Sequence, residues 1–483
     1  MSVYYTSSSD IAKLVGESKV TIAVYGLGKI GQPLAVIFAS AGAKVIGVDV
    51  DEHVVSMINE GYTELLEEPG VEEGIERFVK EEKLWATTDL VKAAQLADFI
   101  VVIVPVFVNE ESKDPDLDAL LTVSEAIGKG LRKGSIVIIE STVPPGTTNG
   151  VVRSIIEKSS NLKAGRDFGL VYSPERAYAG RVIEDVTKRY PKIIGGINEQ
   201  STEVVSMFYS TFCERGIIKM SSIEAAETTK VFEGIYRDAN IALANELAQF
   251  CEKIGLDYFE VKKAANSQTF CHLHDPGVGV GGRCIPVYPY FVLNMADRMG
   301  LKLDVTKIAR KVNEETPLHI IDLVEKGLAK IGKEIKNVKI SILGLSYRGG
   351  VKESRFSPTF DIVRELENKG VLVTVNDVLW NNDEGRRFPF KFEPNIMKAV
   401  DDADCIIIAT DHPEYKELDL EKIVNQIAKK PLVIVDGRQV FETKLFSNFK
   451  DVIYMAVGKP NTYQKTTGIK MKRNVKDQKI ILV

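Results

Sequence analysis

The segment that decides the fold lies near the N-terminus, where residues 20–31 read V-T-I-A-V-Y-G-L-G-K-I-G. An apolar run predicts a strand at 20–25, the G-x-G-x-x-G turn follows, and apolar residues then recur at helical spacing up to Gly42. A second predicted strand at 44–48 ends at Asp49. Strand, glycine turn, helix, strand and terminal acid together form the dinucleotide-binding fingerprint of a Rossmann domain.

Each residue of this turn has a physical role in the prediction. Gly26 permits the tight turn, Gly28 lets the main chain approach a pyrophosphate, and Gly31 lets the helix pack closely on the strand. The N-terminus of the helix offers unpaired N–H groups to the phosphates. Asp49 can accept hydrogen bonds from ribose hydroxyls and would repel a 2′-phosphate, so NAD is the expected cofactor.

Further apolar runs predict buried parallel strands on both sides of a long helical segment. The helix expected at 221–253 is too long for one small domain, so we expect it to join two domains and to pair with a second subunit. The predicted fold is α/β, with two Rossmann-like doubly wound parallel sheets joined by an all-helical central region. The further strands are expected at 99–105, 135–140, 169–173, 338–343, 371–375, 405–409 and 432–435, with a helix at 359–369.

The expected division of the chain follows from this pattern. We expect an NAD-binding domain at 18–215, a central helical dimerisation domain at 216–330, a nucleotide-binding Rossmann-like domain at 336–460 and a basic tail at 461–483. The tail is expected to be solvated or to contact another subunit.

A second segment concentrates chemistry, because residues 276–289 read P-G-V-G-V-G-G-R-C-I-P-V-Y-P. This density of glycine before Cys284 indicates close approach of the main chain or positive φ angles. A thiol on such a turn is reachable and, as a thiolate, is a strong nucleophile, although a packed structural thiol is the alternative. The segment 141–147, S-T-V-P-P-G-T, leaves the carboxyl end of a predicted strand, where open α/β sheets bind ligands, or else is an ordinary Pro-Gly turn.

The composition excludes several classes of protein. With 45% hydrophobic residues and a formal charge of -5, the 483-residue chain gives no electrostatic reason to bind nucleic acid. The most apolar run, 99–108, is far shorter than the about 20 residues that span a bilayer. The scattered cysteines and the absence of a secretory pattern favour a soluble cytoplasmic protein without membrane contact. The cluster at 271–274, C-H-L-H, has no second ligand cluster nearby, so no metal is expected.

The ordered motifs G-L-G-K-I-G, S-T-V-P-P-G-T, S-P-E-R, A-E-T-T-K, G-V-G-G-R-C-I-P, G-L-S-Y-R and D-G-R resemble those of the UDP-glucose/GDP-mannose dehydrogenase family over about residues 18–460. The resemblance implies NAD-dependent, four-electron oxidation of the C6 alcohol of a UDP-sugar to a uronate. It also implies a homodimer formed through the long helix. The expected substrate is UDP-N-acetyl-D-mannosamine. UDP-glucose or another UDP-hexose is an alternative, and so is a nucleotide-sugar binding protein with impaired turnover.

The resemblance also implies roles for particular residues. Cys284 would form a thiohemiacetal and then a thioester. Lys230 would stabilise the oxyanion or assist as acid/base, and Thr142 and Glu175 would order water or move protons. The residues expected to bind the cofactor are Gly26, Gly28, Lys29, Ile30, Gly31, Asp49, Pro105, Ser141, Thr142 and Arg355. The residues expected to bind the substrate are Glu175, Arg176, Lys230, Arg237, Asn240, Gly277, Gly279, Gly281, Tyr347, Arg348 and Arg438.

Four positions depart from the family pattern. Tyr288 stands four residues after the cysteine, where the family has Asp, and Gly234 stands four residues after the lysine, where the family has Asn. Phe270 replaces a basic residue, and Arg283 replaces a His. The first two departures concern the hydrolysis of the thioester.

Overall fold

The computed structural model describes residues 2–109, 111–426 and 431–460, so the predicted basic tail at 461–483 lies outside the described residues. The chain divides into two compact units. Unit 1 comprises Met1–Leu243, Gly279–Glu315 and Ser346–Phe360, and unit 2 comprises Ala244–Val278, Thr316–Leu345 and Asp361–Val483. The domain boundaries expected from the sequence stay a prediction.

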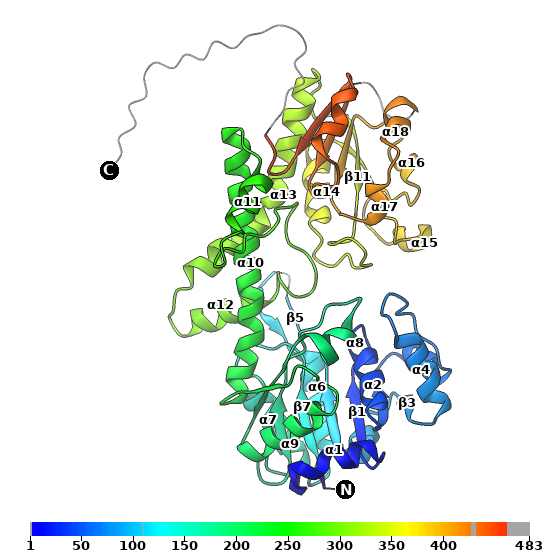
Figure 1. Ribbon diagram of the computed structural model, residues 1–483, viewed down its shortest axis with the longest axis vertical. Helices are drawn as coiled ribbons and strands as arrows, with labels where there is room; N and C mark the ends of the chain where they lie inside the picture. The colour runs from blue at the N-terminus through cyan, green and yellow to red at the C-terminus, as the bar shows by residue number, and fades with distance from the viewer. Residues whose placement is uncertain (1, 110, 427–430, 461–483) are drawn as a thin grey trace. The chain divides into compact units, whose positions relative to one another are not determined.

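Unit 1 is built on one large sheet whose described strands follow the order β10-β9-β8-β7-β4-β1-β2-β3 (Figure 1). Strand β1 pairs with β2 and β4 on its two sides, with Ile22 opposite both Val45 and Phe99. This order is that of a doubly wound sheet. The strands are β1 (Thr21–Tyr25), β2 (Lys44–Val48), β3 (Leu84–Thr87), β4 (Phe99–Val102), β7 (Ile136–Ile139), β8 (Gly169–Tyr172), β9 (Lys192–Gly196) and β10 (Ile217–Lys219), and a small hairpin pairs β5 (Phe107–Val108) with β6 (Pro115–Asp116).

One feature of this sheet differs from the parallel arrangement expected from the sequence. Strand β9 runs antiparallel to β8, and β10 runs parallel to β9. The first residue of β9, Lys192, therefore lies at the same edge of the sheet as the carboxyl ends of β7 and β8. The apolar run I-I-G-G gives no information on strand direction, which is set by the connection.

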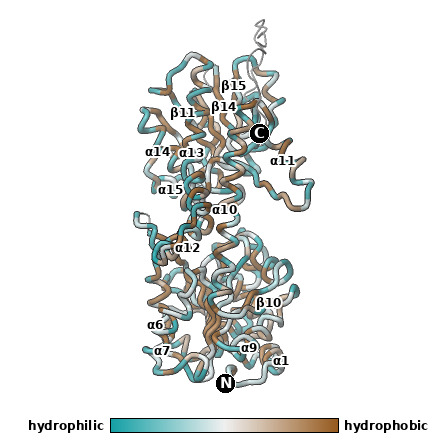
Figure 2. Tube along the Cα trace, turned by 90° about the vertical axis from the view of Figure 1, so that its left-hand side faces the viewer, coloured by the Kyte–Doolittle hydropathy of each residue, from teal (hydrophilic) through white to brown (hydrophobic). Residues whose placement is uncertain are grey.

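Helices cover both faces of the sheet, because side chains of successive strand residues point to opposite faces. In β4, Phe99 and Val101 join one apolar core, whereas Ile100 and Val102 join the other. Figure 2 shows hydrophobic stretches gathered in the interior of unit 1. The helices are α1 (Ser8–Gly16), α2 (Gly31–Ser40), α3 (Glu52–Asn59), α4 (Val71–Lys80), α5 (Leu90–Leu96), α6 (Asp118–Gly130), α7 (Arg153–Ser160), α8 (Val182–Glu184) and α9 (Glu199–Ser210).

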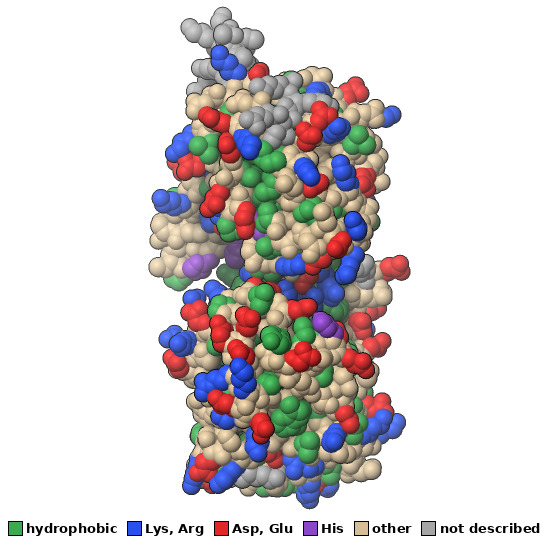
Figure 3. Space-filling model, turned by 90° about the vertical axis from the view of Figure 1, so that its right-hand side faces the viewer, with side chains coloured by type: hydrophobic (Ala, Val, Ile, Leu, Met, Phe, Trp, Pro, Cys, Tyr) green, Lys and Arg blue, Asp and Glu red, His purple; other side chains and the backbone are tan. Residues whose placement is uncertain are grey.

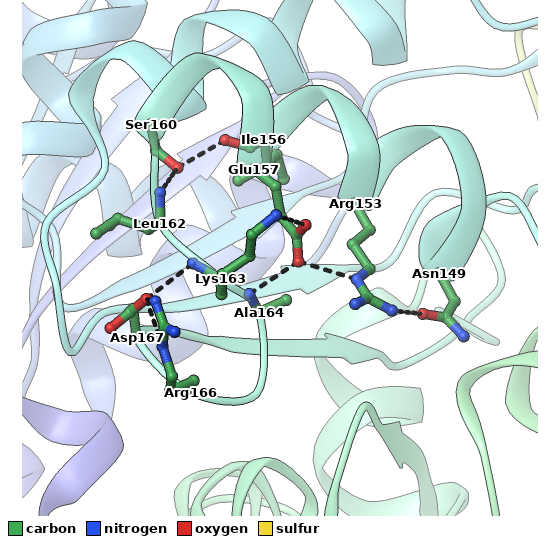
Figure 4. A network of polar contacts seen from close by, with 10 residues as sticks. All are labelled: Asn149, Arg153, Ile156, Glu157, Ser160, Leu162, Lys163, Ala164, Arg166 and Asp167. Carbon is green, nitrogen blue, oxygen red and sulfur yellow. Dashed lines mark hydrogen bonds and ion pairs between the residues drawn. The ribbon is translucent and has the colours of Figure 1, made fainter.

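A polar network fixes the turn that leads from α7 into β8 (Figure 4). The Glu157 carboxylate accepts hydrogen bonds from Arg153 Nε at 3.0 Å, Lys163 Nζ at 2.9 Å and the main-chain N–H of Ala164 at 3.1 Å. Burial opposes the charge, but these donors outweigh it and hold the pKa of Glu157 below its ordinary value. The network thereby ties the end of α7 to the turn that precedes β8.

The helical region contains the long helix predicted at 221–253, which the structure places at Ile223–Ile254 as α10 (Figure 1). Its 32 residues correspond to about 48 Å of helix. The other helices of this region are α11 (Tyr258–Ala265), α12 (Tyr288–Arg298) and α13 (Asp304–Lys330), which carries Pro317 in its interior.

Unit 2 contains a second sheet, in which the described strands are parallel and follow the order β12-β11-β13-β14-β15. Apolar side chains such as Ile406, Ile434 and Phe446 form a core against it. The predicted fold class is thus confirmed. The strands are β11 (Lys339–Leu343), β12 (Leu372–Asn376), β13 (Cys405–Ile408), β14 (Leu432–Asp436) and β15 (Val452–Ala456), with helices α14 (Pro358–Asn368), α15 (Asn382–Gly385), α16 (Ile396–Ala399), α17 (Pro413–Lys416) and α18 (Leu420–Gln426).

The surface carries charges of both signs, and Figure 3 shows acidic and basic side chains interspersed on one face. Among the described residues, no helix has the length and apolarity that crossing a membrane requires.

The glycine turn after β1 yields a stability prediction. A Cβ atom at Gly31 would lie 1.7 Å from the carbonyl oxygen of Gly26, whereas a Cβ at Gly28 would meet no atom within 4 Å. We expect Gly31→Ala to lower the free energy of unfolding by about 1–3 kcal/mol, the usual cost of overpacking. Gly28→Ala should change it by at most about 0.5 kcal/mol. Thermal unfolding of the two variants checks this, and equal melting temperatures would contradict it.

Candidate active site

The turn between β1 and α2 has the geometry of a dinucleotide cradle. Gly26 adopts a φ of +98°, and its N–H donates to the carbonyl of Val48 at 2.8 Å. The open space in front of Gly28 leaves room for phosphates to approach the main chain. The Asp49 carboxylate accepts the N–H of Leu27 at 2.7 Å, which fixes the turn, and it keeps lone pairs for further donors. These residues fit NAD.

The other residues expected near the cofactor lie in the same unit. Lys29 Nζ donates to the carbonyl of Lys352 at 3.2 Å and lies 3.5 Å from Glu67, so it is engaged within the protein. Pro105 is exposed and lies three residues after the end of β4 and two residues before the start of β5. The Arg355 guanidinium carbon lies 4.3 Å above the ring centroid of Phe107. Ile30 is the N-cap residue of α2.

The S-T-V-P-P-G-T segment is fixed from two sides at the carboxyl end of β7. The Ser141 hydroxyl donates to the carbonyl of Val104 at 2.6 Å. The Glu227 carboxylate, on α10, accepts the N–H of Gly146 at 2.5 Å and that of Thr148 at 2.8 Å. Burial raises the pKa of Glu227 to about 7. These contacts connect the segment that carries Thr142 to the long helix.

A buried ion cluster lies where β7, β8 and β9 meet. Lys192 Nζ donates to Glu140 Oε2 at 2.8 Å and to Glu175 Oε2 at 3.1 Å, and the Tyr209 hydroxyl also donates to Glu140. The side chains of Lys192, Glu140 and Glu175 are at most 8% exposed. The antiparallel direction of β9 brings the lysine to the two carboxylates.

Lys192 supports the charge of Glu175 in this cluster, whereas burial keeps the pKa of Glu140 above its ordinary value. Burial opposes the charge on Lys192, but Glu140 and Glu175 outweigh burial and raise the pKa of the lysine. Burial also opposes the charge on Glu175, but Lys192 and the N–H of Ala177 hold the pKa of this carboxyl below its ordinary value. Glu175 is therefore an ionised carboxylate inside the protein, suited to orient water or accept a proton.

Cys284 is exposed four residues before the first residue of α12, and its carbonyl accepts the N–H groups of Val287 and Tyr288. Lys230, on α10, interacts electrostatically with Cys284 and Glu175, which oppose the lowering of the pKa of Lys230 by burial. The Tyr288 hydroxyl donates to Thr142 Oγ1 at 3.2 Å. The structure thus brings together the four residues that the sequence suggested for catalysis.

The glycines before the cysteine let two other segments come close. The N–H of Gly282 donates to the carbonyl of Arg355 at 2.9 Å. A Cβ atom at Gly281 would lie 2.7 Å from Tyr347 Cβ, and Gly279 has a φ of +134°. Burial raises the pKa of Tyr347, Arg348 opposes this, and the charge of Cys284 adds to it, which places the phenol near the thiol.

Two arginines predicted to bind substrate, Arg237 and Arg348, lie with Arg181 around one tyrosine. The guanidinium carbons of Arg181, Arg237 and Arg348 lie 4.9, 5.1 and 5.7 Å from the Tyr178 ring centroid. Arg176 pairs with Glu233 at 2.6 Å. The Nε atoms of Arg348 and Arg176 are buried and have no hydrogen-bond partner among the described residues. Guanidinium groups in this arrangement suit an anionic ligand.

Two predicted substrate residues belong to unit 2. A Cβ atom at Gly277 would lie 2.9 Å from Arg438 Nη1, so the glycine makes room for the arginine. Arg438 Nε donates to the carbonyl of Ala409 at 3.2 Å, and burial lowers the pKa of this guanidinium. In unit 1, the Asn240 amide donates to the carbonyl of Tyr236 within α10.

The sequence did not single out several residues that shape the site. Lys192 was missed, although a lysine that opens an apolar strand is a signal of a buried ion pair. Tyr178, around which the arginines lie, was also missed. Glu353 was missed as well, and its Oε2 atom lies 2.6 Å from Arg283 Nε. Within the described ranges, no group of three or more His, Cys, Asp or Glu residues is arranged to hold a metal ion.

Comparison with known proteins gives consistent results. Three models of the UDP-glucose/GDP-mannose dehydrogenase family match: the NAD binding domain at residues 20–213, the central domain at 224–315 and the UDP binding domain at 341–443. The UDP-N-acetyl-D-mannosamine dehydrogenase of Pyrococcus horikoshii is 34% identical over 422 residues, which cover 87% of this chain and 96% of that protein. The enzyme of the same name from Campylobacter jejuni is 33% identical over 84% of this chain and 98% of its own length.

Solved structures agree with these matches. The structure of the UDP-D-ManNAc dehydrogenase from Pyrococcus horikoshii has a TM-score of 0.82 at 31% identity, with 92% of this chain and 100% of that chain covered. A UDP-glucose dehydrogenase from Pyrobaculum islandicum has a TM-score of 0.81 at 25% identity, with 91% and 98% covered.

The buried ion cluster yields a prediction. Lys192→Met should lower the free energy of unfolding by about 3–5 kcal/mol, because it leaves two buried carboxylates without their cation. Adding Glu140→Gln should recover part of this loss by removing one of the charges. Lys219→Met is the matched control, since Lys219 forms an exposed ion pair with Glu203 worth at most about 1 kcal/mol. Chemical denaturation measures all three, and a Lys192→Met protein as stable as the control would contradict the account.

Proposed function

Because the chain belongs to the UDP-glucose/GDP-mannose dehydrogenase family and is an NAD-dependent nucleotide-sugar dehydrogenase, we propose that it oxidises the C6 alcohol of UDP-N-acetyl-D-mannosamine to the carboxylate. The names of the relatives from Pyrococcus horikoshii and Campylobacter jejuni support this substrate. UDP-glucose is the second candidate, favoured by the resemblance in structure to the Pyrobaculum islandicum enzyme.

The observation that carries the proposal is the exposed Cys284 thiol, which interacts electrostatically with Lys230, a lysine that also interacts with the Glu175 carboxylate. Oxidation of an alcohol to an acid takes two oxidations and one water, and a thiol can hold the carbon from the first oxidation until water releases the product. NAD, when bound, accepts a hydride in each of the two oxidations. The thiolate attacks the aldehyde carbon, a C–S bond forms, and the electron pair of the carbonyl moves to oxygen. The Lys230 ammonium stabilises the negative charge on that oxygen.

The second half of the reaction releases the product. Loss of hydride from the thiohemiacetal carbon restores the C=O bond and leaves a thioester on Cys284. Water then attacks this carbon, the C–S bond breaks, and the thiolate leaves. Glu175 accepts the proton of the water, a role that suits a carboxylate kept ionised by Lys192. Because the intermediate is covalent, the aldehyde cannot escape between the two oxidations.

Arginines of unit 1 are assigned to the nucleotide diphosphate. We assign Arg237 and Arg348, beside Tyr178, to this task. The expected role of Arg438, which lies beside Gly277 in unit 2, stays a prediction. The planar guanidinium group matches the geometry of phosphate oxygens. Gly26, Gly28, Gly31 and Asp49 hold the NAD.

Counting NADH per sugar consumed tests the proposed reaction. With excess NAD, UDP-N-acetyl-D-mannosamine should yield two NADH per sugar over many turnovers, and UDP-glucose assayed in parallel should react more slowly. Cys284→Ser should lower the rate by at least about a thousandfold because it removes the nucleophile. Cys271→Ser, at another accessible thiol, is the control.

Three outcomes would contradict parts of this proposal. Faster reaction of UDP-glucose would reassign the substrate, and an active Cys284→Ser enzyme would exclude the covalent route. Tight binding of the UDP-sugars without any NADH would identify a binding protein with impaired turnover.

We also propose a homodimer formed through α10. Large apolar side chains are exposed along this helix at positions 232, 236, 243, 250 and 254, with Phe232 57% and Phe250 59% exposed. Their spacing of four and seven residues places them on one side of the helix, a pattern typical of helix pairing. The apolar stripe fits the same stripe of a second copy.

Light scattering after size exclusion tests the dimer. The double variant Phe232→Glu/Phe250→Glu should be a monomer, because burying two carboxylates without partners costs more than the contact yields. Gln249→Glu, an exposed position beside the stripe, should stay dimeric. A dimer in the double variant would exclude this interface.

A further inference from the structure

Gly234 and Tyr288, the two departures from the family pattern closest to the cysteine, are in direct contact in the structure. Gly234 lies on α10 and Tyr288 is the first residue of α12, and both are buried. A Cβ atom at Gly234 would lie 2.5 Å from Tyr288 Cδ2 and 3.1 Å from Tyr288 Cβ. The aromatic ring therefore fits only because residue 234 has no side chain, so the two positions form one steric unit.

The ring lies one helical turn after the cysteine. The Tyr288 hydroxyl donates to Thr142 Oγ1 at 3.2 Å, and the main-chain N–H of Tyr288 donates to the carbonyl of Cys284 at 3.0 Å. Lys230 Nζ lies 6.0 Å from the ring centroid, on the side of α10. The phenol thus stands among a hydroxyl, a sulfur and an ammonium group.

The protonation state of the phenol decides what it can do there. Burial raises the pKa of Tyr288 well above its ordinary value, and the negative charge of Cys284 raises it further. The phenol keeps its proton over the working pH range, so it is a permanent donor and cannot act as a general base. Proton acceptance in hydrolysis remains with Glu175.

We propose that Tyr288, seated on Gly234, donates a hydrogen bond from its hydroxyl to the Cys284 sulfur and so stabilises the thiolate that attacks the aldehyde. This inference rests on the proposed function for the identity of the nucleophile. Since the thiolate has no proton to give, the phenol turns its hydrogen toward sulfur, and the Thr142 hydroxyl then donates to the phenol oxygen. Tyr288 and Gly234 stand where the family pattern has Asp and Asn. Tyr288 supplies an aromatic hydrogen-bond donor, and Gly234 leaves the space that its ring needs.

The pH dependence of Cys284 alkylation tests the hydrogen bond. Iodoacetamide reacts with the thiolate, and mass spectrometry of the peptide that contains Cys284 separates it from the other cysteines. In Tyr288→Phe the ring remains on Gly234 but the donor is gone, so the midpoint of alkylation should rise by roughly one pH unit. Tyr290→Phe is the control, because its hydroxyl, two residues along α12, contacts Glu314 instead. An unchanged midpoint in Tyr288→Phe would overturn the inference.

A double-mutant cycle tests the steric unit. Gly234→Ala should slow alkylation of Cys284 at pH 7 at least about fivefold in the natural protein, because the added methyl displaces the ring. In a Tyr288→Leu background the same substitution should have no further effect, since the smaller side chain leaves room. Equal effects of Gly234→Ala in both backgrounds would refute the coupling.

These measurements use neither sugar nor NAD, so their outcome is independent of the substrate. If alkylation of Cys284 leaves the dehydrogenase rate unchanged, the proposed function fails, whatever the midpoint in Tyr288→Phe. If alkylation of Cys284 abolishes the dehydrogenase rate and the alkylation midpoint shifts in Tyr288→Phe, the proposed function and the Tyr288 hydrogen bond are both supported.

Discussion

The site depends on one buried ammonium group. Lys192 joins Glu140 and Glu175 at the edge of the sheet of unit 1, and each of these ions would be costly to bury alone. The cluster forms because β9 reverses direction and brings the lysine to the carboxyl ends of β7 and β8. Because Lys192 lies beside it, Glu175 stays ionised within the protein interior. In the proposed reaction, this ion pair keeps ionised the carboxylate that we assign as proton acceptor in thioester hydrolysis.

A second constraint is space around the cysteine. Gly281 and Gly282 allow Tyr347 and the main chain of Arg355 to approach the loop, and Gly234 allows the Tyr288 ring to lie beside the thiol. In each case the absence of a Cβ atom decides which side chain of another segment reaches Cys284. These glycines matter because they leave space for neighbouring side chains, and not because they make the main chain flexible.

The sequence predicted those parts of the fold whose signals are local. The strand, glycine turn and helix at 20–42 and the helix α10 follow from patterns within a few residues, and the structure confirms them. The direction of β9 was not predictable, because its apolar run reads alike in either direction. Lys192 and Tyr178 were missed because their partners come from distant segments. Tyr288 and Gly234 were visible as separate departures, but their contact exists only in the folded chain.

Trapping the acyl enzyme tests the central claim, which is covalent catalysis by Cys284 with Glu175 as proton acceptor. Glu175→Gln should slow hydrolysis more than either oxidation, so the thioester accumulates when this variant turns over. After mixing with NAD and UDP-N-acetyl-D-mannosamine and quenching in acid, mass spectrometry should find the sugar nucleotide bound as an acyl group on the peptide that contains Cys284. Formation of the uronate without any such adduct would contradict the account.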